Sequence, residues 1–137
     1  MFYVGPKCRI FVSIAAYRDN DAPKTVRNLL ETADRPHMLK VGILNQIDSL
    51  VDGDCLVGNT GNVHEIQTEA YSSKGACWAR SRIMQEMLTT EDFYLQIDSH
   101  SRFDQGWDTT LIRMYEEAAN PHIVFSCYPA GFDRTTE

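Results

Sequence analysis

The sequence lacks long apolar runs and an excess of positive charge. Its 137 residues carry 13 lysines and arginines against 19 aspartates and glutamates, which gives a formal net charge of −6. This balance does not favour nucleic acid or anionic membranes as partners. No stretch approaches the roughly 20 apolar residues of a membrane span, and the first residues lack the layout of a signal peptide. An anionic ligand would therefore need a metal ion or particular arginines beside it.

Cysteine is scarce and shows no pairing pattern. Cys8, Cys55, Cys77 and Cys127 include no Cys-x-x-Cys pair, and the chain has no Asn-x-Ser/Thr acceptor site. With 43% hydrophobic residues, the chain can bury a sizeable core without disulfide bonds. We therefore expect buried free thiols and a cytoplasmic protein.

Hydrophobic periodicity predicts that strands and helices alternate along the chain. The predicted strands cover residues 9–16, 39–44, 63–70, 93–98 and 123–128, and the predicted helices cover 23–33, 76–88 and 107–118. The fourth strand has the composition of a buried strand, and residues 49–61 are predicted to be loop. This order indicates an α/β fold with a mainly parallel, Rossmann-like sheet and flanking helices, formed as a single domain by residues 1–137.

The tripeptide Asp98-Ser99-His100 ends the fourth predicted strand. Residues two apart on a strand point to the same side, so Asp98 and His100 can converge on one ligand. Open α/β sheets bind ligands at the carboxyl ends of their strands. An oxygen and a nitrogen donor suit a divalent cation such as Mn²⁺, which could carry a diphosphate. A polar strand end that turns into a loop is the alternative interpretation.

The predicted helix before this strand carries two arginines, Arg80 and Arg82. A guanidinium stays charged and presents a planar set of donors to phosphate or carboxylate. Taken alone, either arginine can equally be solvated helix surface. The positions of both just ahead of the Asp-Ser-His strand favour a role in binding an anion.

The order of these motifs resembles the nucleotide-sugar half of a GT-A glycosyltransferase. The resemblance is carried by residues 74–82 and 94–103, together with 13–19 and 126–132. These stretches are similar to the family of cytoplasmic hydroxyproline N-acetylglucosaminyltransferases. The Asp-Ser-His tripeptide also resembles that of the more distant polypeptide N-acetylgalactosaminyltransferases.

The resemblance implies transfer of N-acetylglucosamine from UDP-GlcNAc to a protein hydroxyl of hydroxyproline, Ser or Thr, with retention of the anomeric configuration. It implies Mn²⁺ or Mg²⁺ as cofactor, with Asp98 and His100 as metal ligands and catalytic residues. Arg80 or Arg82 would approach the nucleotide, with Arg80 favoured because it matches the Ala-Arg of such helices, and Asp48 would contact the base or ribose. The implied nucleotide-sugar-binding residues are Tyr17, Arg18, Asp19, Asp48, Arg80 and Asp98.

The resemblance also implies that a GT-A domain continues beyond the last predicted strand, where the family's acceptor groove and a further metal-ligand histidine lie. We therefore expect residues 1–137 to be the donor-binding half of such a domain. The alternative function is a catalytically incomplete module that binds a nucleotide sugar or a partner protein. A phosphatase-like hydrolase that uses Asp98 is less favoured, because a second acidic cluster is missing. An open sheet edge would allow self-association.

Overall fold

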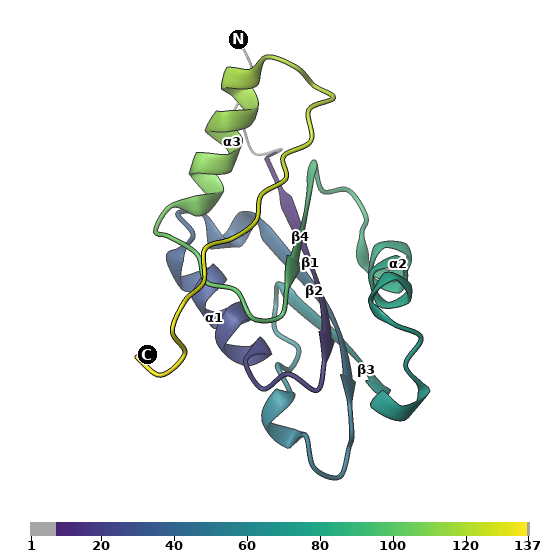
Figure 1. The fold of residues 1–137 in the computed structure, drawn as a ribbon. Coiled ribbons are helices and arrows are strands. Elements are labelled where there is room, and N and C mark those ends of the chain that lie inside the picture. The colour runs from purple at the N-terminus through teal and green to yellow at the C-terminus, as the bar shows by residue number, and fades with distance from the viewer. Residues whose placement is uncertain (1–7, 137) are drawn as a thin grey trace.

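The computed structural model describes residues 8–136, which form a parallel sheet between two layers of helices (Figure 1). The strands and α-helices are, in chain order, β1 Ile10–Tyr17, α1 Ala22–Thr32, β2 Leu39–Ile47, β3 Val63–Glu69, α2 Ala76–Met87, β4 Phe93–Asp98 and α3 Trp107–Ala118. Short 3₁₀ turns occur at η1 Pro36–Met38, η2 Gly53–Cys55 and η3 Ala70–Ser72. The predicted α/β class is confirmed.

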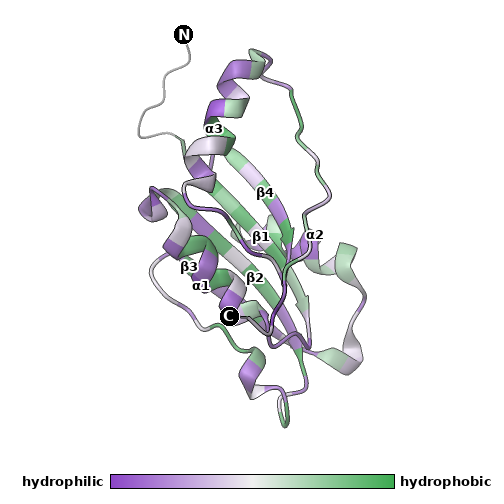
Figure 2. Ribbon diagram, turned by 60° about the vertical axis from the view of Figure 1, so that its left-hand side comes forward, coloured by the Kyte–Doolittle hydropathy of each residue, from purple (hydrophilic) through white to green (hydrophobic). Residues whose placement is uncertain are grey.

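The sheet has the strand order β3-β2-β1-β4, and each neighbouring pair is parallel. Figure 2 shows hydrophobic residues concentrated along these strands. β1 and β2 are buried almost throughout, because helices cover both of their faces. The Rossmann-like arrangement predicted from the alternating elements is therefore present.

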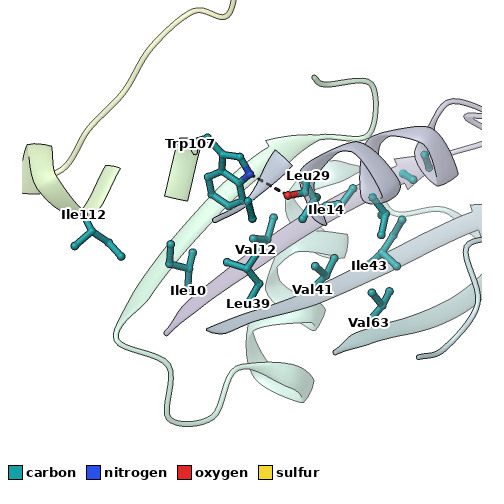
Figure 3. Close-up of a cluster of buried hydrophobic side chains, with 14 of the residues drawn as sticks. Ile10, Val12, Ile14, Leu29, Leu39, Val41, Ile43, Val63, Trp107 and Ile112 are labelled. Atoms are coloured by element: carbon teal, nitrogen blue, oxygen red, sulfur yellow. Dashed lines mark hydrogen bonds between the residues drawn. The ribbon is translucent and has the colours of Figure 1, made fainter. Parts of the chain in front are cut away.

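The larger part of the core lies between the sheet and the helices α1 and α3 (Figure 3). Apolar residues of β1 and β2 pack there against Leu29 of α1 and Trp107 of α3. The buried indole Nε1 of Trp107 donates a hydrogen bond of 2.9 Å to the carbonyl oxygen of Leu29, which satisfies its polar group. This contact fixes α3 against α1.

A second, smaller core cluster lies on the opposite face under α2. It consists of Phe11, Leu44, Ala79, Ile83 and Met87. Gly42 lies beneath this helix, and a Cβ at that position would come within 2.6 Å of both Met87 Sδ and the Phe11 ring. The absence of a side chain at Gly42 therefore lets α2 pack closely on the sheet.

A buried carboxylate joins the end of α1 to the start of α3. Asp108 accepts hydrogen bonds from the backbone N–H groups of Asp34 and Arg35 at 2.8 and 2.9 Å. The N–H of Gly106 donates to the carbonyl oxygen of Thr32 at 2.7 Å, and Gly106 has a positive φ of 74° that suits glycine. These bonds anchor the far end of the loop that begins with Ser99 and His100.

The prediction that the fourth strand is buried on both faces is wrong. β4 is the edge strand beside β1, and its residues alternate between half-buried and exposed. Phe93, Leu95 and Ile97 pack on the larger core cluster, whereas Tyr94 is exposed. The reason is that α2 packs against β1 and β2 and leaves the other face of β4 uncovered.

The predicted strand at residues 123–128 is also wrong. This segment forms no strand and leaves the side chains of Val124 and Tyr128 86% and 100% exposed. It runs past β4 in Figure 1, and it lines a cavity of about 340 Å³ together with β4 and α3. Its β-rich composition is therefore not matched by strand pairing within the described residues.

All four cysteines are free, but only Cys8 and Cys55 are buried as predicted. Cys77 and Cys127 are exposed, because Cys77 lies in the first turn of α2 and Cys127 lies in the uncovered segment after α3. Burial, followed by the neighbouring Asp54 and Asp52 carboxylates, raises the pKa of the Cys55 thiol to about 11. Within residues 8–136, each helix is too short or too polar to cross a bilayer.

Candidate functional site

All four parallel strands end at the same edge of the sheet. The register places Tyr17 of β1 opposite Gln46 of β2, and Ala15 of β1 opposite Asp98 of β4. The segments that follow these strand ends therefore share one rim, which is where open α/β sheets bind ligands. This rim is the candidate functional site.

A cavity of about 160 Å³ opens at the rim, between the ends of β1 and β2 and the start of α2. It is lined by Ala15, Ala16, Tyr17, Gln46, Ser73, Gly75 and Ala76. A volume below the range of whole-ligand pockets suits one ring or one group of a larger ligand. The first N–H groups of α2 lack partners within the helix, and they favour an anion at this end.

Gln46 brings a buried polar group to this cavity. Its side-chain Nε2 donates to the carbonyl oxygen of Ala16 at 3.4 Å. Because a carbonyl can only accept, this contact turns the side-chain oxygen of Gln46 away, and that oxygen is buried without a partner. Tyr17, which lies opposite Gln46 in the register, is 56% exposed. Gln46 and Tyr17 thus both line the cavity, and the Gln46 side chain holds an acceptor without a partner.

Arg18 and Asp48 meet through a third residue, Asp52. The Arg18 guanidinium donates to both Asp52 oxygens, from Nε at 2.7 Å and from Nη2 at 3.2 Å. Asp52 Oδ2 also accepts from the backbone N–H of Asp48 at 2.8 Å, while Asp48 Oδ1 accepts from the N–H of Leu50 at 3.0 Å. The hydrogen bond from Arg18 is the largest effect on Asp52 and lowers the pKa of its carboxyl. These contacts close the loop after β2 against the end of β1.

Asp98 and Arg80, two of the predicted site residues, lie beside each other. Arg80 Nη2 is 3.5 Å from Asp98 Oδ1, and the Arg80 Nε is buried without a hydrogen-bond partner. Asp98 is 63% exposed, so its carboxylate remains open to a ligand. Arg82 instead pairs with Glu86 one turn further along α2, at 2.7 Å.

His100 lies beyond the last residue of β4, so strand alternation does not orient it. Its Nδ1 is 2.9 Å from Asp19 Oδ2, and the same oxygen accepts from the Ser99 hydroxyl at 2.7 Å. Burial alone would raise the pKa of Asp19, but hydrogen bonds from Ser99, His100 and the Asp21 N–H together lower it. The Asp19 carboxylate therefore accepts hydrogen bonds from the segment after β1 and from the segment after β4.

Comparison with protein families identifies the family of the chain. The family described as Glycosyltransferase (GlcNAc) matches residues 9–61 and 54–137. The chain belongs to this family. No curated protein matches the chain. As a GlcNAc glycosyltransferase, the protein is a transferase that has a sugar donor and an acceptor.

The glycosyltransferase holds the loop after β4 through contacts that sequence reasoning missed. Thr25 Oγ1 donates to the Ser99 carbonyl at 2.7 Å and accepts from the Ser101 N–H at 3.0 Å. Arg102 donates from Nη1 and Nη2 to the two oxygens of Asp21, both at 2.9 Å. The partners are more than 70 residues apart in sequence. The position of Arg102 two residues after the tripeptide is the one local signal for this support.

The predicted site residues of this glycosyltransferase thus fall into three contact groups along the rim. Asp98 meets Arg80, His100 meets Asp19, and Arg18 meets Asp48 through Asp52. Tyr17 faces the cavity instead. Ser99, Asp52 and Gln46 belong to the rim without having been predicted as site residues.

In this glycosyltransferase, a metal ion could not take all of its ligands from the side chains that the structure describes. Among residues 8–136, no group of three or more His, Cys, Asp and Glu side chains could hold one. Asp98 and His100 nevertheless supply the oxygen and nitrogen donors that Mn²⁺ accepts. Cations of this kind often take one or two protein ligands and complete their shell with phosphate oxygens and water. In residue type, these two side chains suit a metal that would bind together with a diphosphate.

Proposed function

We propose that this glycosyltransferase is a GT-A enzyme of the hydroxyproline N-acetylglucosaminyltransferase type. It would transfer N-acetylglucosamine from UDP-GlcNAc to a protein hydroxyl, with a divalent metal and with retention of configuration. The observation that carries the proposal is that two pairs, Asp98 with Arg80 and His100 with Asp19, lie along one rim. This rim lies beside a cavity at the start of a helix.

In the proposed binding mode, the donor nucleotide takes one orientation on the rim. The uracil ring enters the cavity against Tyr17, and its N3–H donates to the unused side-chain oxygen of Gln46. Arg18, which pairs with Asp52, would contact the nucleotide from the position after Tyr17. The diphosphate then lies toward the first N–H groups of α2 and the Arg80 guanidinium, which both favour negative charge.

The chemical step concentrates negative charge on the leaving diphosphate. Arg80 would hold that charge more strongly in the transition state than in the ground state, which lowers the barrier. Asp98 and His100 would hold Mn²⁺ or Mg²⁺, which when bound supplies further neutralisation of the diphosphate. An acidic protein with a net charge of −6 needs such local positive charge to bind an anionic donor.

The acceptor and the compartment form part of the same proposal. The acceptor would be a hydroxyproline, Ser or Thr hydroxyl of another protein, and the enzyme would work in the cytoplasm. The exposed free thiols of Cys77 and Cys127 support a reducing compartment, because such thiols persist where disulfides are kept reduced.

Calorimetric titration with UDP tests the donor site directly. We expect UDP to bind the wild-type protein in the presence of Mn²⁺, and Asp98→Ala to weaken this binding by roughly 10- to 100-fold, because a metal ligand is lost. Asp104→Ala is the matched control, since Asp104 is an exposed carboxylate on the same loop. Binding that is absent, or that depends neither on Mn²⁺ nor on Asp98, would refute the proposal.

A second candidate is a module that binds the nucleotide sugar without transferring the sugar. It is favoured by the finding that the described residues offer no group of three metal-binding side chains. This candidate predicts metal-dependent UDP binding without hydrolysis of UDP-GlcNAc or transfer of the sugar. Release of N-acetylglucosamine from the donor by the purified protein would eliminate it.

A further inference from the structure

We propose that Asp19 is a positioning residue that fixes the tautomer and orientation of His100. The interaction holds the proton on Nδ1 and leaves the Nε2 lone pair free to face a ligand. Asp19 would thereby act through His100, in place of the uridine-binding role that sequence resemblance implies for it. The tautomer and orientation of His100 do not depend on the proposed function. Only the identification of the ligand as a divalent cation rests on it.

The contacts of Asp19 leave it little freedom to do anything else. Its Oδ1 accepts from the backbone N–H of Asp21 at 3.0 Å, and its Oδ2 accepts from the Ser99 hydroxyl at 2.7 Å. The side chain is only 15% exposed. A carboxylate that is fixed by two donors offers a rigid third acceptor position, and His100 Nδ1 occupies it at 2.9 Å.

The direction of the hydrogen bond decides the tautomer. An ionised carboxylate can only accept, so the neutral imidazole must donate through Nδ1–H and keep its lone pair on Nε2. His100 is 49% exposed and follows the end of β4. Without the contact to Asp19, no strand geometry would hold its ring.

A histidine that donates one ring N–H to a carboxylate is the arrangement that orients metal-binding imidazoles. Ser99 adds a second constraint, because its hydroxyl binds the same oxygen and its carbonyl accepts from the buried Thr25. The end of β1 and the loop after β4 are thus joined at one carboxylate oxygen. That junction places the imidazole on the rim that also carries Asp98.

The first test uses the protein without metal or nucleotide. Two-bond ¹H–¹⁵N correlation spectra of the imidazole, recorded about two pH units above the ordinary histidine pKa of about 6.5, report which nitrogen carries the proton. We expect the Nδ1–H form for His100 in the wild-type protein and in Asp19→Asn, which keeps an acceptor. We expect the Nε2–H form in Asp19→Leu. A wild-type His100 in the Nε2–H form would overturn the inference.

The second test measures Mn²⁺ affinity by paramagnetic resonance titration with UDP present. We expect Asp19→Leu to weaken Mn²⁺ binding by roughly 10- to 100-fold and Asp19→Asn to restore part of the loss. Asp104→Leu removes the same charge from an exposed position and should leave the affinity unchanged. Circular dichroism and thermal unfolding of each variant separate a fold defect from a lost contact.

The outcomes distinguish the inference from the proposed function. Equal Mn²⁺ affinities for Asp19→Leu and Asp104→Leu, with both variants folded, would overturn the positioning role. A wild-type protein that shows the Nδ1–H tautomer but binds neither UDP nor Mn²⁺ would refute the proposed donor site and would still support Asp19 as the residue that fixes the His100 ring.

Discussion

At the scale of single residues, Gln46 shows how the rim is prepared for a ligand. Its side-chain oxygen is buried without a partner, while its Nε2 contacts the Ala16 carbonyl. A buried acceptor that forms no hydrogen bond costs about 1–3 kcal/mol. Thr68, its neighbour on β3 in the register, has a hydroxyl that is likewise buried without a partner. Such a cost is offset when a ligand supplies the missing donor.

Replacement of Gln46 by Met tests whether its side-chain oxygen accepts a hydrogen bond from the base of the nucleotide. Gln46→Met keeps the volume but removes the acceptor, so we expect UDP affinity to fall about fivefold, the value of one neutral hydrogen bond. CDP affinity should change little, because cytosine presents no N3–H. Calorimetry with both nucleotides measures the ratio.

Gln85→Met is the control for Gln46→Met, because Gln85 is exposed on α2. Unfolding in urea shows whether either substitution disturbs the fold. An unchanged ratio of UDP to CDP affinity in folded Gln46→Met would rule out base reading by this residue.

At the scale of elements, the site depends on how α1 and α3 are joined. Asp108 in the first turn of α3 caps the chain after α1 by accepting from the Asp34 and Arg35 N–H groups. Trp107 beside it donates to the Leu29 carbonyl of α1. The loop that carries His100 therefore has a fixed far end as well as a fixed start.

The Asp108 contact should contribute measurably to stability. Asp108→Ala leaves two partly buried backbone donors without their acceptor, so we expect a loss of about 2 kcal/mol in the free energy of unfolding. Urea denaturation measures it. Asp104→Ala, on the exposed part of the preceding loop, should cost less than about 0.5 kcal/mol. Equal losses in the two variants would show that the cap contributes nothing.

Sequence patterns predicted well the helices and strands whose conformation follows from their own amino-acid composition. The apolar runs that became β1 and β2 and the helical spacing of α1, α2 and α3 identified the core elements. The segment 123–128 has an equally β-rich composition and forms no strand. A strand needs a neighbouring strand, and local composition carries no information about whether one is available.

The site was predictable in type but not in its pairings. Asp98 and Arg80 come from neighbouring elements in the α/β order, so their approach could be expected. The pairs His100 with Asp19 and Arg18 with Asp52 join residues 81 and 34 positions apart. Such contacts depend on the crossover geometry, which periodicity does not describe.

At the scale of the whole molecule, one side of the sheet stays open. Within residues 8–136, β4 pairs with β1 alone, and the segment 123–128 lies beside it without pairing. Tyr94, Val124 and Tyr128 expose apolar surface there, next to a cavity of about 340 Å³. An unpaired edge with adjoining apolar surface is a template for association between chains.

This open side leads us to predict that the chain self-associates through β4. Sedimentation velocity between micromolar and millimolar concentrations, the range in which exposed edges associate, should show a sedimentation coefficient that rises with concentration. Tyr94→Lys places a charge on the edge strand and should abolish the rise. Leu50→Lys changes an apolar residue in the loop after β2 that is even more accessible, 91% exposed against 36% for Tyr94, and should leave the rise unaffected. A wild-type chain that stays monomeric over this range, or an equal effect of both substitutions, would show that the open side of β4 does not serve as an interface.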